Sequence, residues 1–187
     1  MLMTDSTRLY LETPLAKSVT ILFKKLEARL GLNEPVDALI AGGIAMHFYT
    51  GTRIACDVDV QFSPYILIPE DLMVEGNPGE DFCRPLYFDV GHNLNFSLVH
   101  PEYLRDTVPL DLGLDFINPF LLSPVDMVVS KIARLSEVDQ RDIVQLSRLG
   151  LVASDAVEHR AKEAMEECVC NRLDLHVQIQ KVLRLIE

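Results

Sequence analysis

Residues 36–62 read VDALIAGGIAMHFYTGTRIACDVDVQF and carry most of the information about the fold. The stretch begins with VDALI (36–40), a short strand-like run. Gly42 and Gly43 follow, and the segment after them has the composition of a short helix. A second strand-like run occupies residues 55–62. The order therefore predicts a strand, a glycine turn, a helix and a second strand.

The glycine pair stands where the first predicted strand meets the predicted helix. Glycine has no Cβ, so the backbone N–H groups of Gly42 and Gly43 can approach a phosphate closely, and a helix N-terminus adds a favourable dipole. The same pair also suits a tight turn that binds no ligand. Taken alone, it leaves both interpretations open.

Asp57 and Asp59 are separated by one residue in the second predicted strand. Alternate residues of a strand point to the same face, so both carboxylates point into one site while Val58 faces the core. Two adjacent carboxylates repel each other unless a cation neutralises them. Mg²⁺ suits such a pair, because it binds a few carboxylate oxygens together with water and substrate phosphates. The alternative is a solvated edge strand, but the flanking residues are apolar. We therefore predict that Asp57 and Asp59 bind Mg²⁺, as one or two ions.

The strand, the glycine pair, the helix and the Asp-Val-Asp strand together resemble the core motif of the polymerase-β-like nucleotidyltransferase superfamily. Within it, residues 40–62 are most similar to the AbiEii-type nucleotidyltransferases, which are toxins of toxin–antitoxin pairs. The resemblance implies metal-dependent transfer of a nucleoside monophosphate (NMP) from a nucleoside triphosphate (NTP) to an acceptor. It also implies that Gly42 and Gly43 bind the phosphates, that Arg53 offsets their negative charge, and that an antitoxin protein is a partner. The acceptor stays open between an RNA end, a protein and a small molecule.

The resemblance extends to two later segments. LLSPVDMVVSKIARL at 121–135 and DQRDIVQL at 139–146 look like the family's later motifs. By analogy, Lys131 would contact substrate phosphates or assist catalysis, and Asp142 would support the site. Without the resemblance, Lys131 is an ordinary exposed helix lysine, and Asp142 is an acid favoured by the helix dipole.

The sequence departs from the family pattern in two respects. Many members have a third carboxylate on a neighbouring strand, and Asp89, in the predicted strand 86–90, is the candidate. Asn95, in the predicted strand 94–99, could hold the same place and would leave no general base. The family also has Thr or Ser where this chain has Ala55. The alternative function is therefore a catalytically inactive nucleotidyltransferase-fold module that binds a nucleotide or a partner protein.

The remaining patterns predict the fold class. Apolar spacing predicts a helix over 14–30, and Ser123-Pro124 is a typical helix start, after which the pattern is helical to the end of the chain. We expect an α+β protein. Residues 1–120 would form a small mixed sheet flanked by helices, and residues 121–187 a helical part packed on this core.

The composition limits the classes of binding partner and the cellular location that we expect. The formal net charge of −11 argues against broad binding to DNA or RNA, which needs a basic surface. The sequence contains no run of about 18 apolar residues, so we expect no membrane span, and the first residues lack the pattern of a secretory signal. We therefore expect a cytoplasmic protein whose four cysteines are reduced thiols.

Overall fold

A computed structural model describes residues 8–76, 84–89, 97–168 and 172–186. The chain divides into two compact units. The α/β unit comprises Met1–His92 and Val108–Leu121, and the helical unit comprises Asn93–Thr107 and Leu122–Glu187.

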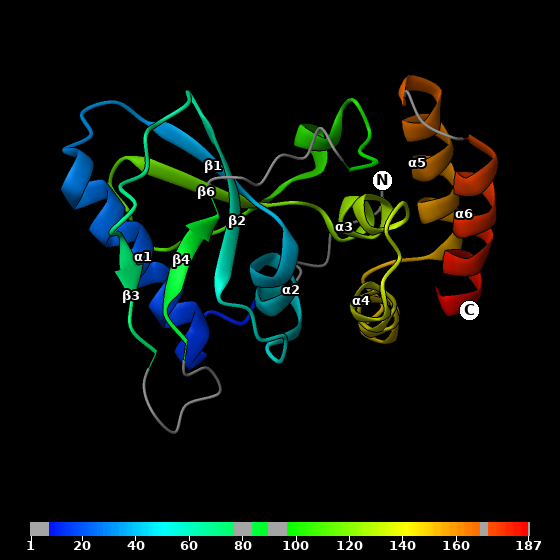
Figure 1. The fold of residues 1–187 in the computed structure, drawn as a ribbon, viewed down its shortest axis with the longest axis horizontal. Helices are drawn as coiled ribbons and strands as arrows, with labels where there is room; N and C mark the ends of the chain where they lie inside the picture. Colours follow the sequence, from blue (N-terminus) through cyan, green and yellow to red (C-terminus); the bar gives the residue numbers. More distant parts are fainter. Residues whose placement is uncertain (1–7, 77–83, 90–96, 169–171, 187) are drawn as a thin grey trace. The chain divides into compact units, whose positions relative to one another are not determined.

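The α/β unit is built on a mixed sheet of six strands in the order β3-β4-β2-β1-β6-β5 (Figure 1). The central strand β1 pairs antiparallel with β2 and parallel with β6, and β2 pairs parallel with β4. A mixed sheet with flanking helices confirms the predicted α+β class. The strands are β1 (Val36–Ile40), β2 (Asp57–Ser63), β3 (Met73–Val74), β4 (Leu86–Asp89), β5 (Val108–Pro109) and β6 (Ile117–Leu121).

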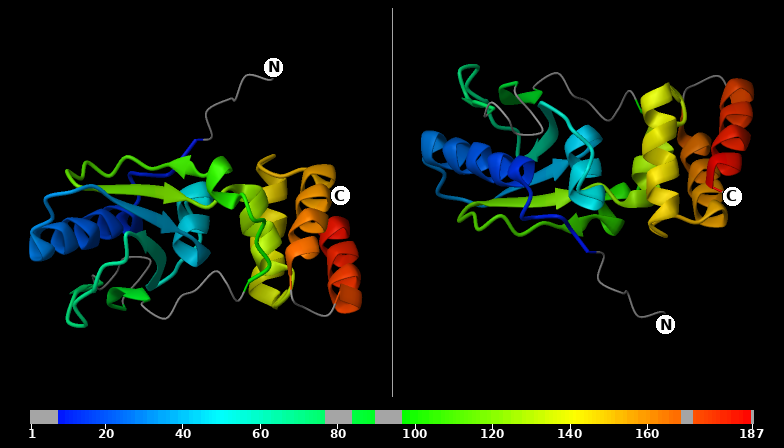
Figure 2. Two further views of the ribbon diagram at one scale, coloured as in Figure 1. Left: turned by 90° about the horizontal axis from the view of Figure 1, so that it is seen from above. Right: turned by 90° about the horizontal axis from the view of Figure 1, so that it is seen from below.

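Helix α1 (Pro14–Leu30) covers one face of this sheet and lies along it in both views of Figure 2. Its Phe23 ring packs against Phe88 at 5.0 Å and against Phe62 at 6.4 Å between ring centroids. Because strand residues alternate between faces, Asp59 and Asp89 lie on the opposite face from these phenylalanines. Asp59 and Asp89 therefore lie on the face of the sheet that points away from α1.

Helix α2 (Gly42–Thr50) follows β1 directly, and every residue from Ile44 to Thr50 is buried. A helix that is hydrophobic on all sides belongs in a core. The His47 side chain of this helix has a hydrogen-bond partner at each ring nitrogen. Nδ1 lies 2.6 Å from the Arg53 carbonyl oxygen, and Nε2 lies 2.6 Å from the Thr13 hydroxyl. His47 therefore joins the N-cap of α1 to the loop that carries Arg53.

A half-buried arginine links three elements of the helical unit. Arg160 Nε donates to Asp126 Oδ1 at 2.8 Å, and its Nη2 lies 2.9 Å from Asp106 Oδ2. Asp126 is fully buried, so the guanidinium supplies the countercharge that burial requires. The same unit has α5 and α6 side by side (Figure 1). Its elements are the 3₁₀ helix η2 (Tyr103–Asp106), α3 (Pro124–Lys131), α4 (Glu137–Arg148), α5 (Ser154–Glu167) and α6 (Arg172–Ile186).

Two expectations need correction. The predicted strand 94–99 is wrong for residues 97–99, which form no strand. Residues 94–96, including Asn95, lie outside the described residues. Pro101 and the 3₁₀ helix η2 follow instead. The prediction of reduced thiols holds for Cys56 but is wrong for Cys168, which is disulfide-bonded. A count of cysteines does not show which sulfur atoms the fold brings together.

Candidate active site

The acidic residues of β2 and β4 meet on the face of the sheet that points away from α1. These strands are neighbours (Figure 1), and their parallel register places Asp59 opposite Asp89 and Asp57 opposite Tyr87. Asp57, Asp59 and Asp89 each offer a carboxylate oxygen within 4.8 Å of the others. We call these three residues the acidic triad. The structure thus brings Asp89 beside the two acids predicted from strand alternation.

The donor set of the acidic triad fits one class of ion. It consists of carboxylate oxygens alone, which suit a hard cation such as Mg²⁺, whereas Zn²⁺ prefers nitrogen and sulfur ligands. Three carboxylates this close repel each other, and a divalent cation would offset that repulsion. Asp57 is exposed, and Asp59 and Asp89 are half-buried, so a ligand can reach them.

The glycine turn is in direct contact with the acidic triad. A Cβ placed on Gly42 would lie 1.6 Å from Asp59 Oδ2, so that carboxylate lies against the glycine backbone. The Ala41 N–H donates to the Asp59 carbonyl oxygen at 2.9 Å, which fixes the strand beside the turn. Ala41 is the N-cap of α2 and gives no side-chain cap to the first N–H groups of the helix. Those groups therefore lie next to the acids, without a side-chain acceptor from the cap.

Arg53 and Ala55 lie beside the second glycine. A Cβ placed on Gly43 would be 2.7 Å from the Ala55 side chain and 3.8 Å from Arg53 Nη2. The small Ala55 side chain, which departs from the family pattern, thus fits closely against Gly43. A carbonyl oxygen only accepts, so His47 Nδ1 donates to the Arg53 carbonyl oxygen, and Nε2 lies 2.6 Å from the Thr13 hydroxyl oxygen. His47 thereby positions this loop.

Lys131 and Asp142 contact each other in the helical unit. Lys131 Nζ lies 2.9 Å from Asp142 Oδ2 and 3.2 Å from Asp139 Oδ1. All three side chains are almost fully buried. The structure therefore brings these two predicted residues together with Asp139, while the other six predicted residues lie in the α/β unit. Without the family resemblance, Lys131 is expected to be an ordinary exposed lysine. That expectation is wrong, because Lys131 is 6% exposed.

The partners of the Asp139 carboxyl in this cluster lower its pKa. Burial alone raises the pKa of Asp139, but hydrogen bonds from Arg134 and Ser136 and the charge of Lys131 outweigh it and hold the pKa well below its ordinary value. Arg134 Nε and Nη2 donate to both oxygens at 2.8 and 2.7 Å. Ser136 and Asp139 also form a capping box at the start of α4. These contacts indicate a structural role for Asp139.

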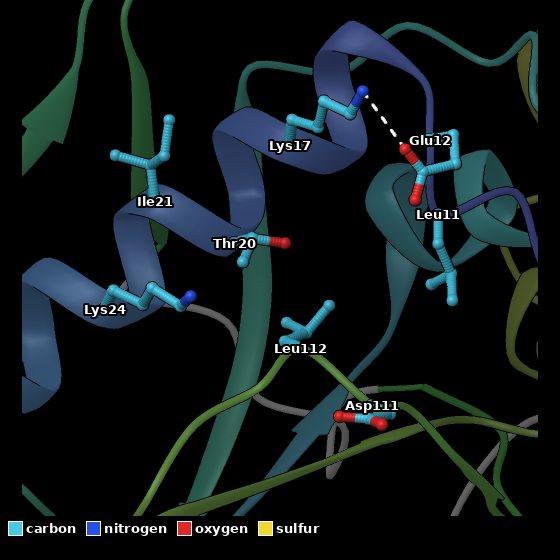
Figure 3. A pocket seen from close by; sticks show the side chains of 8 residues that line it. All are labelled: Leu11, Glu12, Lys17, Thr20, Ile21, Lys24, Asp111 and Leu112. Carbon is cyan, nitrogen blue, oxygen red and sulfur yellow. Dashed lines mark ion pairs between the residues drawn. The ribbon is translucent and has the colours of Figure 1, made fainter.

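A separate pocket of 370 Å³ lies beside α1 (Figure 3). It contains none of the predicted site residues. Its charged lining is balanced, with two lysines and two acids, and Lys17 Nζ pairs with Glu12 Oε2 at 3.1 Å. A triphosphate needs an excess of positive charge, so this pocket is a poor candidate for it. The lining residues are Leu11, Glu12, Lys17, Thr20, Ile21, Lys24, Asp111 and Leu112.

If the acidic triad and the glycine turn together bind a metal-bound nucleotide, replacing Gly42 with alanine should abolish that binding, because the new methyl group must displace the Asp59 carboxylate. Gly31→Ala is the matched control. Gly42 and Gly31 have φ of +60° and +58°, but a Cβ at Gly31 meets nothing within 4 Å. Both variants should lose about 1–2 kcal/mol of folding free energy from the left-handed backbone. Calorimetric titration with Mg²⁺ and ATP should show lost binding in Gly42→Ala only; equal affinity in the two variants would contradict the contact.

Comparison with known proteins assigns the chain at the level of a family. Residues 17–182 match the family model described as "Nucleotidyltransferase of unknown function (DUF6036)". No curated protein and no solved structure matches the chain. No described helix is long and apolar enough to cross a membrane. The match confirms the resemblance to nucleotidyltransferases, while the AbiEii-type assignment stays a prediction. It covers most of the chain, which therefore belongs to this family of nucleotidyltransferases of unknown function.

Proposed function

We propose that the chain transfers an NMP group from an NTP to an acceptor hydroxyl, with a divalent cation held by Asp57 and Asp59 of the acidic triad. One observation carries this proposal. Three carboxylates from neighbouring strands lie within 4.8 Å of one another, and one of them lies against the glycine at the start of α2. Carboxylates that hold a cation beside uncapped helix N–H groups are suited to a metal-bound triphosphate.

Each residue of the α/β site has a proposed role. Asp57 and Asp59 would hold one or two Mg²⁺ ions, which favour ionisation of the attacking hydroxyl and neutralise phosphate charge. Gly42 and Gly43 would bind the β- and γ-phosphates through backbone N–H groups. Arg53 Nη2, beside Gly43, would offset the charge that develops on the leaving group.

The reaction balances as a displacement at phosphorus. The acceptor oxygen forms a bond to the α-phosphorus, the bond to the bridging oxygen breaks, and pyrophosphate leaves. The hydroxyl proton passes to a carboxylate, for which Asp89 is our candidate because it is the third acid of the triad. A third acid beside the pair supports turnover over the alternative of an inactive nucleotide-binding module.

We assign Lys131 and Asp142 to the stability of the helical unit rather than to the reaction, since both are buried and paired with each other. The AbiEii resemblance further leads us to propose a toxin that an antitoxin protein neutralises. We propose the cytoplasm as the location, because NTP and Mg²⁺ are available there.

The proposed activity is tested by incubating the chain with each of the four NTPs labelled at the α-phosphate. Bacterial RNA, bacterial protein and the chain alone serve as acceptors. We expect pyrophosphate release and transfer of label with Mg²⁺, and neither when EDTA removes the metal. Metal-dependent NTP binding without pyrophosphate release under any condition would instead favour the inactive module.

A further inference from the structure

Tyr87 lies beside the acidic triad, on the same strand as Asp89. It lies two residues before Asp89 on β4, so both side chains point to the same face of the sheet. The parallel register sets Tyr87 opposite Asp57, as it sets Asp89 opposite Asp59. Neighbouring strands are about 4.8 Å apart, so the Tyr87 side chain leaves the backbone next to the carboxylates.

The tyrosine ring is open to ligands. Tyr87 is 48% exposed, and Met73, its register partner on β3, is 40% exposed. The residues on either side of Tyr87 in β4, Leu86 and Phe88, are buried against the core. Lys25 Nζ donates to the Met73 carbonyl oxygen at 3.1 Å and so ties β3 to α1. We call these two exposed side chains the Tyr87–Met73 surface. Core packing does not account for them.

The Tyr87–Met73 surface and the glycine turn flank the acids from opposite sides. In the strand order β3-β4-β2-β1, the turn follows β1 and the surface lies on β4 and β3. If the β- and γ-phosphates lie at Gly42 and the α-phosphate lies at the acids, the nucleoside can extend toward Tyr87. Its exposed ring offers a π-face to a planar group.

We propose that the Tyr87–Met73 surface binds the nucleobase of the NTP by stacking on the Tyr87 ring. This inference rests on the proposed function and adds the part of the site that recognises the base. Every base has a π-face, so such a platform accepts all four bases with modest preference. The Met73 thioether adds a polarizable contact at the edge of the platform.

The experiment compares ATP with inorganic tripolyphosphate, which has the phosphates but no base. Calorimetry with Mg²⁺ would measure both affinities for the wild type and for Tyr87→Ala. We expect Tyr87→Ala to bind ATP about 5- to 100-fold more weakly, the usual effect of removing one stacked ring, and to bind tripolyphosphate unchanged. Tyr87→Phe, which keeps the ring, should match the wild type. Tyr65→Ala removes a tyrosine that is 82% exposed and outside the strands, and should change neither affinity.

Three results would overturn the proposal. Equal weakening of ATP and tripolyphosphate binding would place the effect of Tyr87 on the metal or the phosphates. Unchanged ATP affinity in Tyr87→Ala would show that the base does not bind to this surface. If the transfer rate of that variant were nevertheless reduced, the surface would instead be assigned to the acceptor. A wild type that binds neither ligand with Mg²⁺ would overturn the proposed function, and this inference with it.

Discussion

Asp59→Asn is expected to lower the rate of nucleotidyl transfer by at least about a thousandfold, because a bound metal supplies several kcal/mol of transition-state stabilisation. Asp59 belongs to the acidic triad and also lies against Gly42, so its loss affects both the metal and the phosphate end of the site. Pyrophosphate release under saturating NTP and Mg²⁺ is the measurement.

Misfolding as a source of this loss can be tested directly by thermal unfolding. Removing one of three neighbouring negative charges relieves repulsion, so the metal-free melting temperature of Asp59→Asn should be unchanged or higher. Asp37→Asn is the matched control, since Asp37 is an exposed acid on β1, on the same face, and is not part of the triad. It should keep wild-type activity. Activity retained in Asp59→Asn, or lost equally in Asp37→Asn, would contradict the assignment.

The toxin proposal gives the same variant a second readout. If the activity is toxic, induced expression of the wild type should arrest growth of a bacterial host, and expression of Asp59→Asn should not. Equal growth with the two proteins would argue against the toxin role and would leave the chemistry to be judged by the transfer assay.

Asp139→Asn is expected to lower the free energy of unfolding of the helical unit by about 3 kcal/mol, because it removes one partner from a buried ion cluster. Asp139 is fully buried and accepts from Lys131 and Arg134. Urea unfolding followed by circular dichroism measures the loss. Glu137→Gln, an exposed acid in the same first turn of α4, should change stability by less than about 0.5 kcal/mol.

The pH dependence of the same variant follows from the lowered pKa of Asp139. A carboxyl whose pKa is lower in the folded chain stabilises the fold above its unfolded pKa of about 4, and this contribution is lost as pH falls toward the folded pKa. The gap between the wild type and Asp139→Asn should be constant near neutral pH and shrink below about pH 4. A gap that widens on acidification would contradict the role of the ionised carboxylate.

The local elements could be predicted because their signals are local. Strand alternation places Asp57 and Asp59 on one face, and the glycine pair marks the start of α2. The choice of Asp89 as the third acid could not be made from the sequence. It depends on β4 pairing parallel with β2, and strand order is set by long-range packing.

The roles of Lys131 and His47 were hidden for a related reason. Helical periodicity does not show that Lys131 forms ion pairs with Asp139 and Asp142. The burial of a lysine depends on such partners, which here come from another helix. The partners of His47 are 34 and 6 residues away. Tyr87 carried a usable signal, because alternation in LYFD already places it on the face of Asp89.

The binding of Mn²⁺ as a spectroscopic substitute for Mg²⁺ tests the metal site most directly. Electron paramagnetic resonance with a non-hydrolysable NTP analogue counts the ions bound to each chain. The wild type should bind one or two ions per chain, as two-metal and one-metal sites do, and both Asp57→Asn and Asp59→Asn should bind fewer or none. A wild type that binds no Mn²⁺, or variants that keep the wild-type number and affinity, would contradict a metal site at the acidic triad.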